Sequence, residues 1–349
     1  MEMNDLLHAA VDSGASDLLL ANGAPPMLRI RGVLRRTDLE PLTPRGLELL
    51  CQQVLSAEHW KDLQQHHDLD FSITVPRLGR FRFNVHRQRG SLAAAIRHIP
   101  NSVPDIAQLN LPPAVEELTK LSQGLVLVTG QTGSGKTTTL GAMIERINQR
   151  DAKHIITLED PIEFQFSHGK SLVEQREIGA DCPSFASGLR HVLRQDPDVI
   201  LVGELRDLET IRTALQAAET GHLVLATLHS SSASGTVDRI IEVFPPEEQS
   251  QTRVHLAESL KGVLTQRLVQ AIDGRRRVAA VEVMLVSIPI QTSIREGTTH
   301  LIPSMISTSA KRGMQTMEQA LKQLVLNGQI DQTVADSELH EISLRGAIA

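Results

Sequence analysis

Aromatic residues are scarce in this chain. It contains no tyrosine, one tryptophan and seven phenylalanines among 349 residues, so that aromatics make up 2% of the sequence. Proteins that bind single-stranded nucleic acid usually stack its bases on aromatic side chains. A formal net charge of −6 also provides no overall basic surface for a phosphate backbone. The composition therefore argues against a nucleic-acid-binding protein.

Cysteines and long apolar runs are also scarce. Cys51 and Cys182 lie far apart and near no other soft metal ligand, which favours reduced, partly buried thiols in a cytoplasmic protein. The first residues, MEMNDLLHAAVDSGASD, include acids and lack the apolar segment of a secretory signal. No stretch approaches the roughly 18 apolar residues that span a bilayer. We therefore expect a cytoplasmic protein without membrane insertion, which could still bind to a membrane complex.

The length suggests about two domains, and the 41% hydrophobic and 22% charged residues are typical of a globular protein. Strand and helix signals mix over residues 1–100, which predicts an α+β domain. Prolines indicate a linker over 101–123 with a short helix at 114–122. Over residues 124–349, short apolar strands first alternate with helical stretches, which is typical of an α/β domain with a parallel sheet. From about residue 233 the pattern becomes mostly helical.

Hydrophobic periodicity and turn residues predict the individual elements. The first domain is expected to contain helices at 3–13 and 44–64 and strands at 17–20, 27–32, 71–75, 79–85 and 92–99. The second domain is expected to contain strands at 125–128, 154–160, 199–204, 222–229 and 278–286 and helices at 137–150, 184–195, 207–220, 233–242, 247–271, 287–296 and 314–327.

The strongest motif lies in GLVLVTGQTGSGKTTTL, residues 124–140. It fits G-x-x-x-x-G-K-[ST] at every fixed position, after an apolar strand and before a helix, which is the context of a phosphate-binding loop. Glycines let successive N–H groups point at phosphate oxygens, and the next helix adds its positive end. Lys136 is expected to reach the β- and γ-phosphates, and the Thr137 hydroxyl to bind Mg²⁺. The predicted nucleotide-binding residues are Gly130, Gln131, Thr132, Gly133, Ser134, Gly135, Lys136, Thr137 and Thr138.

Two further strands end in acids. In DVILVGE, residues 198–204, Glu204 fits the Walker B position, where a carboxylate at the end of a neighbouring strand binds Mg²⁺ or its water. In TLEDPIEF, the carboxylates of Glu159, Asp160 and Glu163 are suited to metal binding or to orienting an attacking water. The alternative for this segment is a solvated acidic turn.

Two histidines, His222 and His229, bracket the strand LVLATL. A single histidine is more often structural. Two of them beside one strand, at the sheet edge where nucleotide sites lie, could sense a γ-phosphate or hold a water molecule.

Together these four segments resemble the Walker A, Asp box, Walker B and His box of the type II/IV secretion ATPases, and most closely those of the type IV pilus retraction motors. The resemblance extends from GASDLLL to RGMQTMEQAL, and LRQDPDVILVGELRDLETIRTALQAAETGHLVLATLHSSSA is its most specific part. The short amino-terminal region also favours the retraction class, because assembly and type II secretion members usually have long additional amino-terminal domains.

The resemblance implies roles for the candidate residues. Glu163 matches the catalytic glutamate that polarises the attacking water, with Glu159 and Asp160 beside it. Glu204 would bind Mg²⁺ through water, and the His-box pair would be His222 and His229. Arg82 and Arg97 match arginines that reach into a neighbouring subunit's site, where such a group stabilises the charge developing on the γ-phosphoryl. The alternative for these arginines is a solvated β-face.

The implied fold is α/β, with a PAS-like domain at 1–100 and a RecA-like ATPase domain at 124–349, assembled as a hexameric ring. The implied cofactors are ATP and Mg²⁺, although the residues themselves do not distinguish ATP from GTP. The implied partners are further copies of the chain, an inner-membrane pilus platform protein and paralogous pilus ATPases, without nucleic acid. The implied location is the cytoplasmic side of the inner membrane at the pilus base.

One segment departs from the family. Retraction motors carry an AIRNLIRE helix near the carboxyl terminus, which is linked to function rather than to ATP turnover. The matching residues 289–296, PIQTSIRE, keep Ile290, Ile294, Arg295 and Glu296 but replace an arginine, an asparagine and a leucine and begin with proline. Because proline is compatible with the first turn of a helix, we expect the helix to form with altered surface contacts.

The leading hypothesis is therefore a hexameric, Mg-dependent ATPase that powers pilus retraction and twitching motility. An accessory, assembly or secretion ATPase of the same superfamily is the main alternative, because the departure at residues 289–296 affects retraction specifically. Two more distant alternatives are a RecA-like nucleic-acid translocase and a regulatory nucleotide-binding module without turnover.

Overall fold

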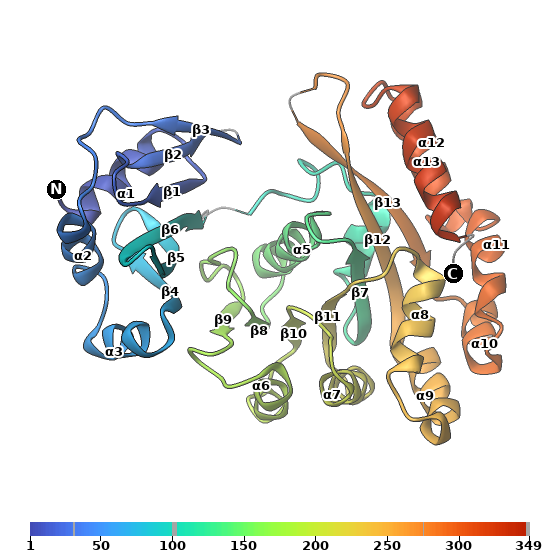
Figure 1. Ribbon diagram of the computed structural model, residues 1–349. Helices are drawn as coiled ribbons and strands as arrows, with labels where there is room; N and C mark the ends of the chain where they lie inside the picture. Colours follow the sequence, from blue (N-terminus) through green and yellow to red (C-terminus); the bar gives the residue numbers. More distant parts are fainter. Residues whose placement is uncertain (31, 100–102, 275, 347–349) are drawn as a thin grey trace. The chain divides into compact units, whose positions relative to one another are not determined.

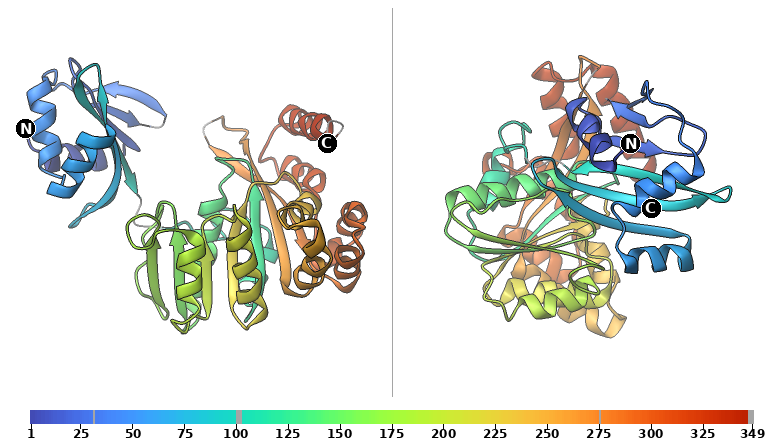
Figure 2. Two further views of the ribbon diagram at one scale, coloured as in Figure 1. Left: turned by 60° about the horizontal axis from the view of Figure 1, so that its bottom comes forward. Right: turned by 90° about the vertical axis from the view of Figure 1, so that its left-hand side faces the viewer.

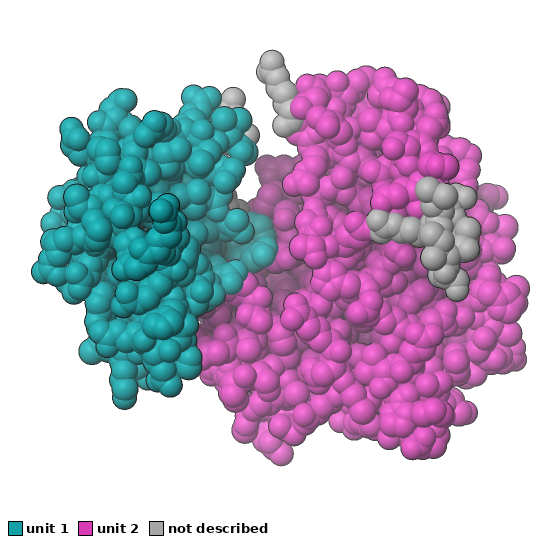
Figure 3. All heavy atoms as spheres, viewed as in Figure 1, with its two compact units in different colours: residues 1–102, 163–165 teal, residues 103–162, 166–349 magenta. Residues whose placement is uncertain are grey.

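The chain divides into two compact units, which Figure 3 shows in different colours. The computed structural model describes residues 1–30, 32–99, 103–274 and 276–346. Unit 1 comprises residues 1–102 with 163–165, and unit 2 comprises residues 103–162 with 166–349. The expected domain boundary at residue 100 lies outside the described residues. Each unit has its own sheet and core.

Unit 1 contains a six-stranded antiparallel sheet in the order β3-β2-β1-β6-β5-β4, together with three helices (Figure 1). The elements are α1 (Met3–Asp12), β1 (Asp17–Leu20), β2 (Met27–Ile30), β3 (Val33–Arg36), α2 (Pro44–Gln52), α3 (Ala57–His66), β4 (Asp68–Val75), β5 (Gly79–Gln88) and β6 (Ser91–Ile99). Strand β5 alternates buried and half-buried residues, so that Phe81, Phe83 and Val85 face the helix-covered core while Arg82 lies on the opposite face.

Two expectations for unit 1 need correction. The single helix expected over 44–64 is two helices: α2 ends at Gln52, and Ser56 starts α3 as its N-cap by accepting a hydrogen bond from the His59 N–H at 3.1 Å. Strand β3 was not expected, since its exposed residues VLRR show no alternation of apolar and polar side chains.

Unit 2 contains a seven-stranded sheet in the order β13-β12-β7-β11-β10-β8-β9, which is parallel except for β13. The elements are α4 (Pro113–Leu118), β7 (Gly124–Gly130), α5 (Lys136–Arg150), β8 (His154–Glu159), β9 (Leu172–Glu177), α6 (Phe185–Val192), β10 (Val199–Val202), α7 (Leu208–Glu219), β11 (Leu223–Leu228), α8 (Ala233–Glu242), α9 (Pro246–Ser259), β12 (Leu260–Gln270), β13 (Arg277–Leu285), α10 (Ile288–Glu296), α11 (Ile302–Ser307), α12 (Met317–Leu326) and α13 (Gln332–Gly346). The expected α/β fold class is confirmed.

Both faces of this sheet are covered, as Figures 1 and 2 show. Along β7, Leu125 and Leu127 point into a core with α6 to α11, whereas Val126 and Val128 point into a second core with α4 and α5. Residues 103–123, expected as a linker, contribute to that second core through Ile106, Ala114, Val115 and Leu118. Burial on both faces explains why β7 is an uninterrupted apolar run.

The largest error of the sequence-based assignment lies at residues 247–271, which were expected to form one helix. Helix α9 ends at Ser259, and Leu260–Gln270 form β12. Leu260, Val263, Leu264 and Leu268 recur at helical spacing. Nevertheless, β12 is a central strand that pairs with β7 on one side and β13 on the other. Residues 260–270 form a strand because β7 and β13 offer backbone hydrogen-bonding partners on both sides, and these partners are not visible in the local sequence pattern.

The two remaining expectations concern the cysteines and the membrane. Cys51 and Cys182 are buried free thiols, and burial raises the pKa of Cys51 to about 11 and that of Cys182 above its usual value. In the part of the chain that the structure describes, no helix is long and apolar enough to cross a bilayer.

Candidate nucleotide site

The phosphate loop joins the carboxyl end of β7 to the first turn of α5, as the motif predicts. Gly130, Gly133 and Gly135 have φ angles of 141°, 78° and 88°, a region that residues with side chains rarely adopt. At Gly130 a Cβ atom would also lie 2.4 Å from the Gln266 carbonyl oxygen and 2.6 Å from the Ser134 hydroxyl. The curled backbone therefore requires glycine and forms the type of cradle that binds a nucleotide's phosphates.

Lys136 is the buried cation of this loop. Its Nζ donates hydrogen bonds to the carbonyl oxygens of Gly130 at 2.9 Å and Gln131 at 3.0 Å. The Ser134 Oγ is buried and has no hydrogen-bond partner among the described residues. The Lys136 ammonium and the unsatisfied Ser134 hydroxyl are both suited to binding a phosphate group. Thr137 is the next residue of α5, and its hydroxyl is the type of oxygen ligand that Mg²⁺ prefers.

Strand β12 supports the loop from behind, which no sequence motif indicates. The Thr129 hydroxyl donates to the Thr265 hydroxyl at 3.0 Å, and the Gln266 amide donates to the Thr139 hydroxyl on α5 at 2.9 Å. The Leu268 side chain lies 3.6 Å from the Cβ position of Gly135. These contacts depend on the pairing of β12 with β7. They could not be predicted from a sequence assignment that made residues 247–271 a helix.

Glu204 lies just beyond β10, at the same sheet edge as the phosphate loop, although β11 separates β10 from β7. Its Oε2 lies 2.7 Å from Arg206 Nη2, and its Oε1 lies 3.1 Å from His229 Nε2. Burial would raise the pKa of Glu204, but the Arg206 hydrogen bond and the charges of His229, Arg206 and Lys136 outweigh it and hold this pKa below its usual value. Glu204 is thus held as a carboxylate, the form that binds Mg²⁺ or its water.

The two histidines lie at opposite ends of β11. His229 follows the carboxyl end, next to Glu204, and its carbonyl oxygen accepts a hydrogen bond from Arg239 Nη1 at 2.6 Å. His222 precedes the amino end, where its carbonyl oxygen accepts from the N–H of Gly124 at the start of β7. The expectation that both lie at the nucleotide edge is therefore wrong for His222 within one subunit. A strand that runs parallel to β7 can place only one of its ends beside the phosphate loop.

The acidic segment after β8 separates into inward- and outward-facing groups. Glu159 is buried and accepts hydrogen bonds from the Thr157 hydroxyl at 2.6 Å and the Gln175 amide at 3.1 Å. Asp160 is exposed, and its charge, after the hydrogen bond and charge of Glu204, contributes to a raised pKa of Arg206. Glu163 is exposed and belongs to unit 1. Its catalytic role stays a prediction.

Arg82 and Arg97 are directly opposite each other on β5 and β6 of unit 1. Arg97 donates to Asp17 at 2.9 Å, whereas Arg82 lies 3.6 Å from Asp70. The Arg82 side chain is 40% exposed and the Arg97 side chain 68% exposed, so both guanidinium groups are accessible to a second molecule. Their action in a neighbouring subunit's site also stays a prediction.

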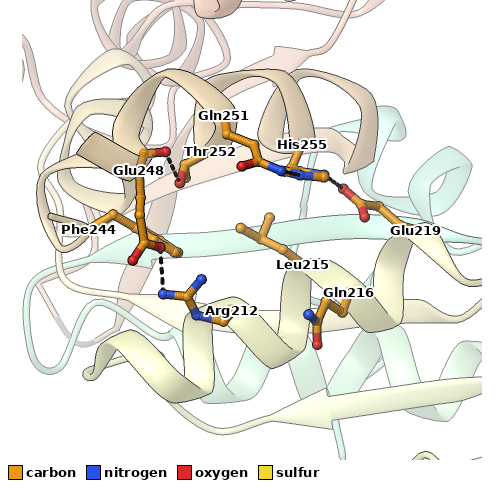
Figure 4. Close-up of a pocket in the computed structure, with 9 residues that line it drawn as sticks. All are labelled: Arg212, Leu215, Gln216, Glu219, Phe244, Glu248, Gln251, Thr252 and His255. Atoms are coloured by element: carbon orange, nitrogen blue, oxygen red, sulfur yellow. Dashed lines mark hydrogen bonds and ion pairs between the residues drawn. The ribbon is translucent and has the colours of Figure 1, made fainter. Parts of the chain in front are cut away.

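A separate pocket of about 320 Å³ lies between α7 and α9 (Figure 4). Its charged groups are mutually paired: Arg212 lies 2.7 Å from Glu248, and His255 lies 2.7 Å from Glu219. Arg212 also lies over the Phe244 ring, 5.2 Å from its centroid. None of the predicted nucleotide-binding residues lines this pocket, whose contacts tie α7 to α9.

Comparison with known proteins decides the family. The family model described as "Type II/IV secretion system protein" matches residues 2–342. The chain belongs to this family. It is 45% identical to the type IV pilus retraction ATPase PilT of Pseudomonas aeruginosa PAO1, over 95% of this chain and 96% of that protein. It is 38% identical to the type IV pilus ATPase PilU of the same organism, over 97% of this chain and 88% of PilU.

A solved structure agrees with this assignment. The crystal structure of the pilus retraction motor PilT with bound ADP superimposes with a TM-score of 0.91 at 46% identity, covering 96% of each chain. The chain is thus a nucleotide-using ATPase of the type II/IV secretion family, and the phosphate loop, Glu204 and His229 lie together at one edge of its parallel sheet.

Proposed function

We propose that this secretion-family ATPase converts ATP hydrolysis into retraction of a type IV pilus, and hence into twitching motility. The observation that carries the proposal is the 45% identity to the retraction ATPase PilT over nearly the full length of both chains. The proposed location is the cytoplasmic face of the inner membrane at the pilus base, where the chain would act on a membrane platform protein. No nucleic acid is part of this proposal.

In the proposed reaction, the loop N–H groups and Lys136 bind the ATP phosphates, and Glu204 and the Thr137 hydroxyl hold Mg²⁺, with Glu204 acting through water. When bound, the ion would neutralise charge on the β- and γ-phosphate oxygens. Lys136 supports this role because its ammonium already lies within the loop. His229 would hold Glu204 in place, and it is suited to sensing the γ-phosphate because it contacts that carboxylate directly.

Glu163 is proposed to orient and polarise the attacking water. Neighbouring groups are suited to this arrangement: the N–H of Ile162, directly before Glu163, donates to the buried carboxylate of Glu177 at 3.1 Å and so restrains the segment. Asp160, three residues before Glu163, is also exposed. Glu159 is proposed to act by supporting this segment, since its carboxylate accepts bonds from inside the sheet.

The proposed active form is a hexameric ring in which each site lies between subunits. The amino-terminal domain, residues 1–100, would supply Arg82 and Arg97, and the ATPase domain, residues 124–349, would supply the phosphate loop of the adjacent subunit. Movement of these domains as rigid bodies would then couple hydrolysis to work.

Mixing two inactive variants tests the shared site. We expect Lys136→Ala subunits and Arg82→Ala/Arg97→Ala subunits each to be inactive alone, because each lacks charge needed in the transition state. Mixed rings should regain hydrolysis, since some interfaces then combine an intact phosphate loop with intact arginines. Phosphate release measured against mixing ratio checks this, and mass photometry gives the ring size. Activity that stays at zero at all ratios, in rings shown to be mixed, would contradict action in trans.

An accessory pilus ATPase is the second candidate, supported by α10. This helix forms as expected, with Pro289 in its first turn and Ile290 and Ile294 fully buried. Its accessible side chains include Gln291, Thr292 and Arg295, so the surface it presents differs from AIRNLIRE. Loss of this chain without any effect on pilus number or motility would favour the accessory role.

A further inference from the structure

Glu282 on β13 accepts hydrogen bonds from three separate elements. Its Oε1 accepts from the N–H of Ala233 at 2.6 Å, in the first turn of α8. Its Oε2 accepts from the N–H of Met317 at 3.4 Å, in the first turn of α12. The Thr265 hydroxyl, directly opposite on β12, also hydrogen-bonds to this carboxylate. One side chain therefore satisfies N–H groups that two helices leave unpaired at their starts.

These contacts lead directly to the nucleotide edge. Thr265 accepts a hydrogen bond from Thr129, the residue before Gly130 of the phosphate loop. Helix α8 follows the short segment from His229 to Ser232, and His229 contacts Glu204. Glu282 thus connects the strand that bears the phosphate loop with the segment that holds the Walker B acid. The hydrogen bond from the Met317 N–H extends the connection to α12.

Glu282 makes these contacts without a counter-charge. Among the described residues, no lysine, arginine or histidine forms an ion pair with it. Burial raises its pKa above the usual value for glutamate, against the effect of the bonds from Ala233, Met317 and Thr265. Burying a carboxylate without a counter-charge costs free energy, and only the hydrogen bonds from Ala233, Met317 and Thr265 offset that cost here.

We propose that Glu282 is a positioning residue for ATP hydrolysis. It fixes the first turn of α8, and through it His229 and Glu204, relative to the phosphate loop. It also ties the start of α12 to the same point, so that the carboxyl-terminal helices follow the geometry of the nucleotide edge. This inference rests on the proposed roles of His229 and Glu204.

Glu282→Gln tests the proposal with little change in volume. Glutamine offers one acceptor oxygen, and its NH₂ group would face an N–H donor at the other helix, so both starts cannot be held. We expect kcat to fall on the order of tenfold, because small displacements of catalytic groups have effects of this size or larger. KM and the affinity for ADP should stay within about twofold, since the phosphate loop is unchanged. The melting temperature should fall no further than in Thr316→Ala, because one helix start loses its acceptor, and kcat is measured where the variant is fully folded.

Two matched variants separate the effect of Glu282 at the start of α8 from its effect at the start of α12. Ser232→Ala removes the hydroxyl that accepts from the Gly235 N–H at 3.1 Å and loosens the start of α8, so it should share part of the kcat loss. Thr316→Ala removes the capping box at the start of α12 without touching α8. It should lower the melting temperature while leaving kcat unchanged. An equal loss of kcat in Thr316→Ala would overturn the proposal that Glu282 affects hydrolysis through the first turn of α8.

Glu204→Gln, measured in the same assay, separates this inference from the proposed function. If Glu204→Gln hydrolyses ATP normally, the proposed Walker B role fails. If Glu204→Gln is inactive but Glu282→Gln keeps full kcat, the positioning role is overturned while the proposed function stands. The same conclusion follows if Glu282→Gln loses activity only in proportion to an unfolded fraction, measured by circular dichroism at the assay temperature.

Discussion

Glu163→Gln is expected to reduce ATP hydrolysis by about 10²- to 10⁴-fold, the usual contribution of a general base. Glutamine keeps the size of the side chain but cannot take up a proton or polarise water as a carboxylate does. Because Glu163 is exposed, the variant should fold with nearly wild-type stability. It should still bind ADP and ATP through the phosphate loop. Steady-state phosphate release and binding of a fluorescent ADP measure the two effects separately.

Glu174→Gln is the matched control for Glu163→Gln. Glu174 is an exposed carboxylate on the neighbouring strand β9, with only a weak contact of 3.7 Å to His154. Its replacement should leave hydrolysis unchanged, which shows that loss of one acidic charge near this segment is not sufficient. Wild-type hydrolysis by Glu163→Gln would refute the catalytic assignment and favour Asp160 as the acid that orients water.

Lys136→Ala should abolish both nucleotide binding and hydrolysis. The Lys136 ammonium donates to two loop carbonyls, so its removal deprives the cradle of its cation and of the bonds that hold its shape. Loss of one such transition-state contact commonly costs about 10²- to 10³-fold in rate. A ligand at about 100 times its Kd stabilises a protein by about 2.7 kcal/mol. Thermal melting with and without Mg-ADP should show this gain in wild type and little of it in Lys136→Ala.

Lys120→Ala controls for the loss of a lysine. Lys120 forms an exposed ion pair with Glu117 at 2.7 Å, outside the loop, and such pairs contribute little to stability. This control should keep the full ADP-dependent stabilisation and full hydrolysis. A wild-type thermal response to ADP in Lys136→Ala would mean that the loop N–H groups alone bind the phosphates. Comparison with Glu163→Gln then distinguishes loss of binding from loss of chemistry.

The phosphate loop could be predicted from sequence because the residues of its motif are close together in the chain. The positive φ angles at Gly133 and Gly135 favour glycine, and Lys136 directly follows Gly135 at the start of α5. The apolar run of β7 indicates burial on both faces. Each signal occurs within a few residues of the next, so no knowledge of distant pairing was needed.

Other parts of the site depend on contacts between distant segments and were therefore missed. Residues 260–270 have a helix-like apolar spacing, and only pairing with β7 and β13 makes them a strand. Gln266 and Glu282 gain their partners through that pairing. His222 was expected at the nucleotide edge, but it precedes β11 at the opposite end, because position beside a strand does not show which end of that strand faces the ligand. Strand direction relative to β7 settles this point.

Surface motility and pilus number, measured together in the organism that encodes the chain, test the central claim most directly. A deletion strain should lose twitching and accumulate surface pili. Wild type should restore both properties, whereas Lys136→Ala and Glu163→Gln should restore neither. Disappearance of pili from the deletion strain would contradict retraction and indicate an assembly or secretion motor instead.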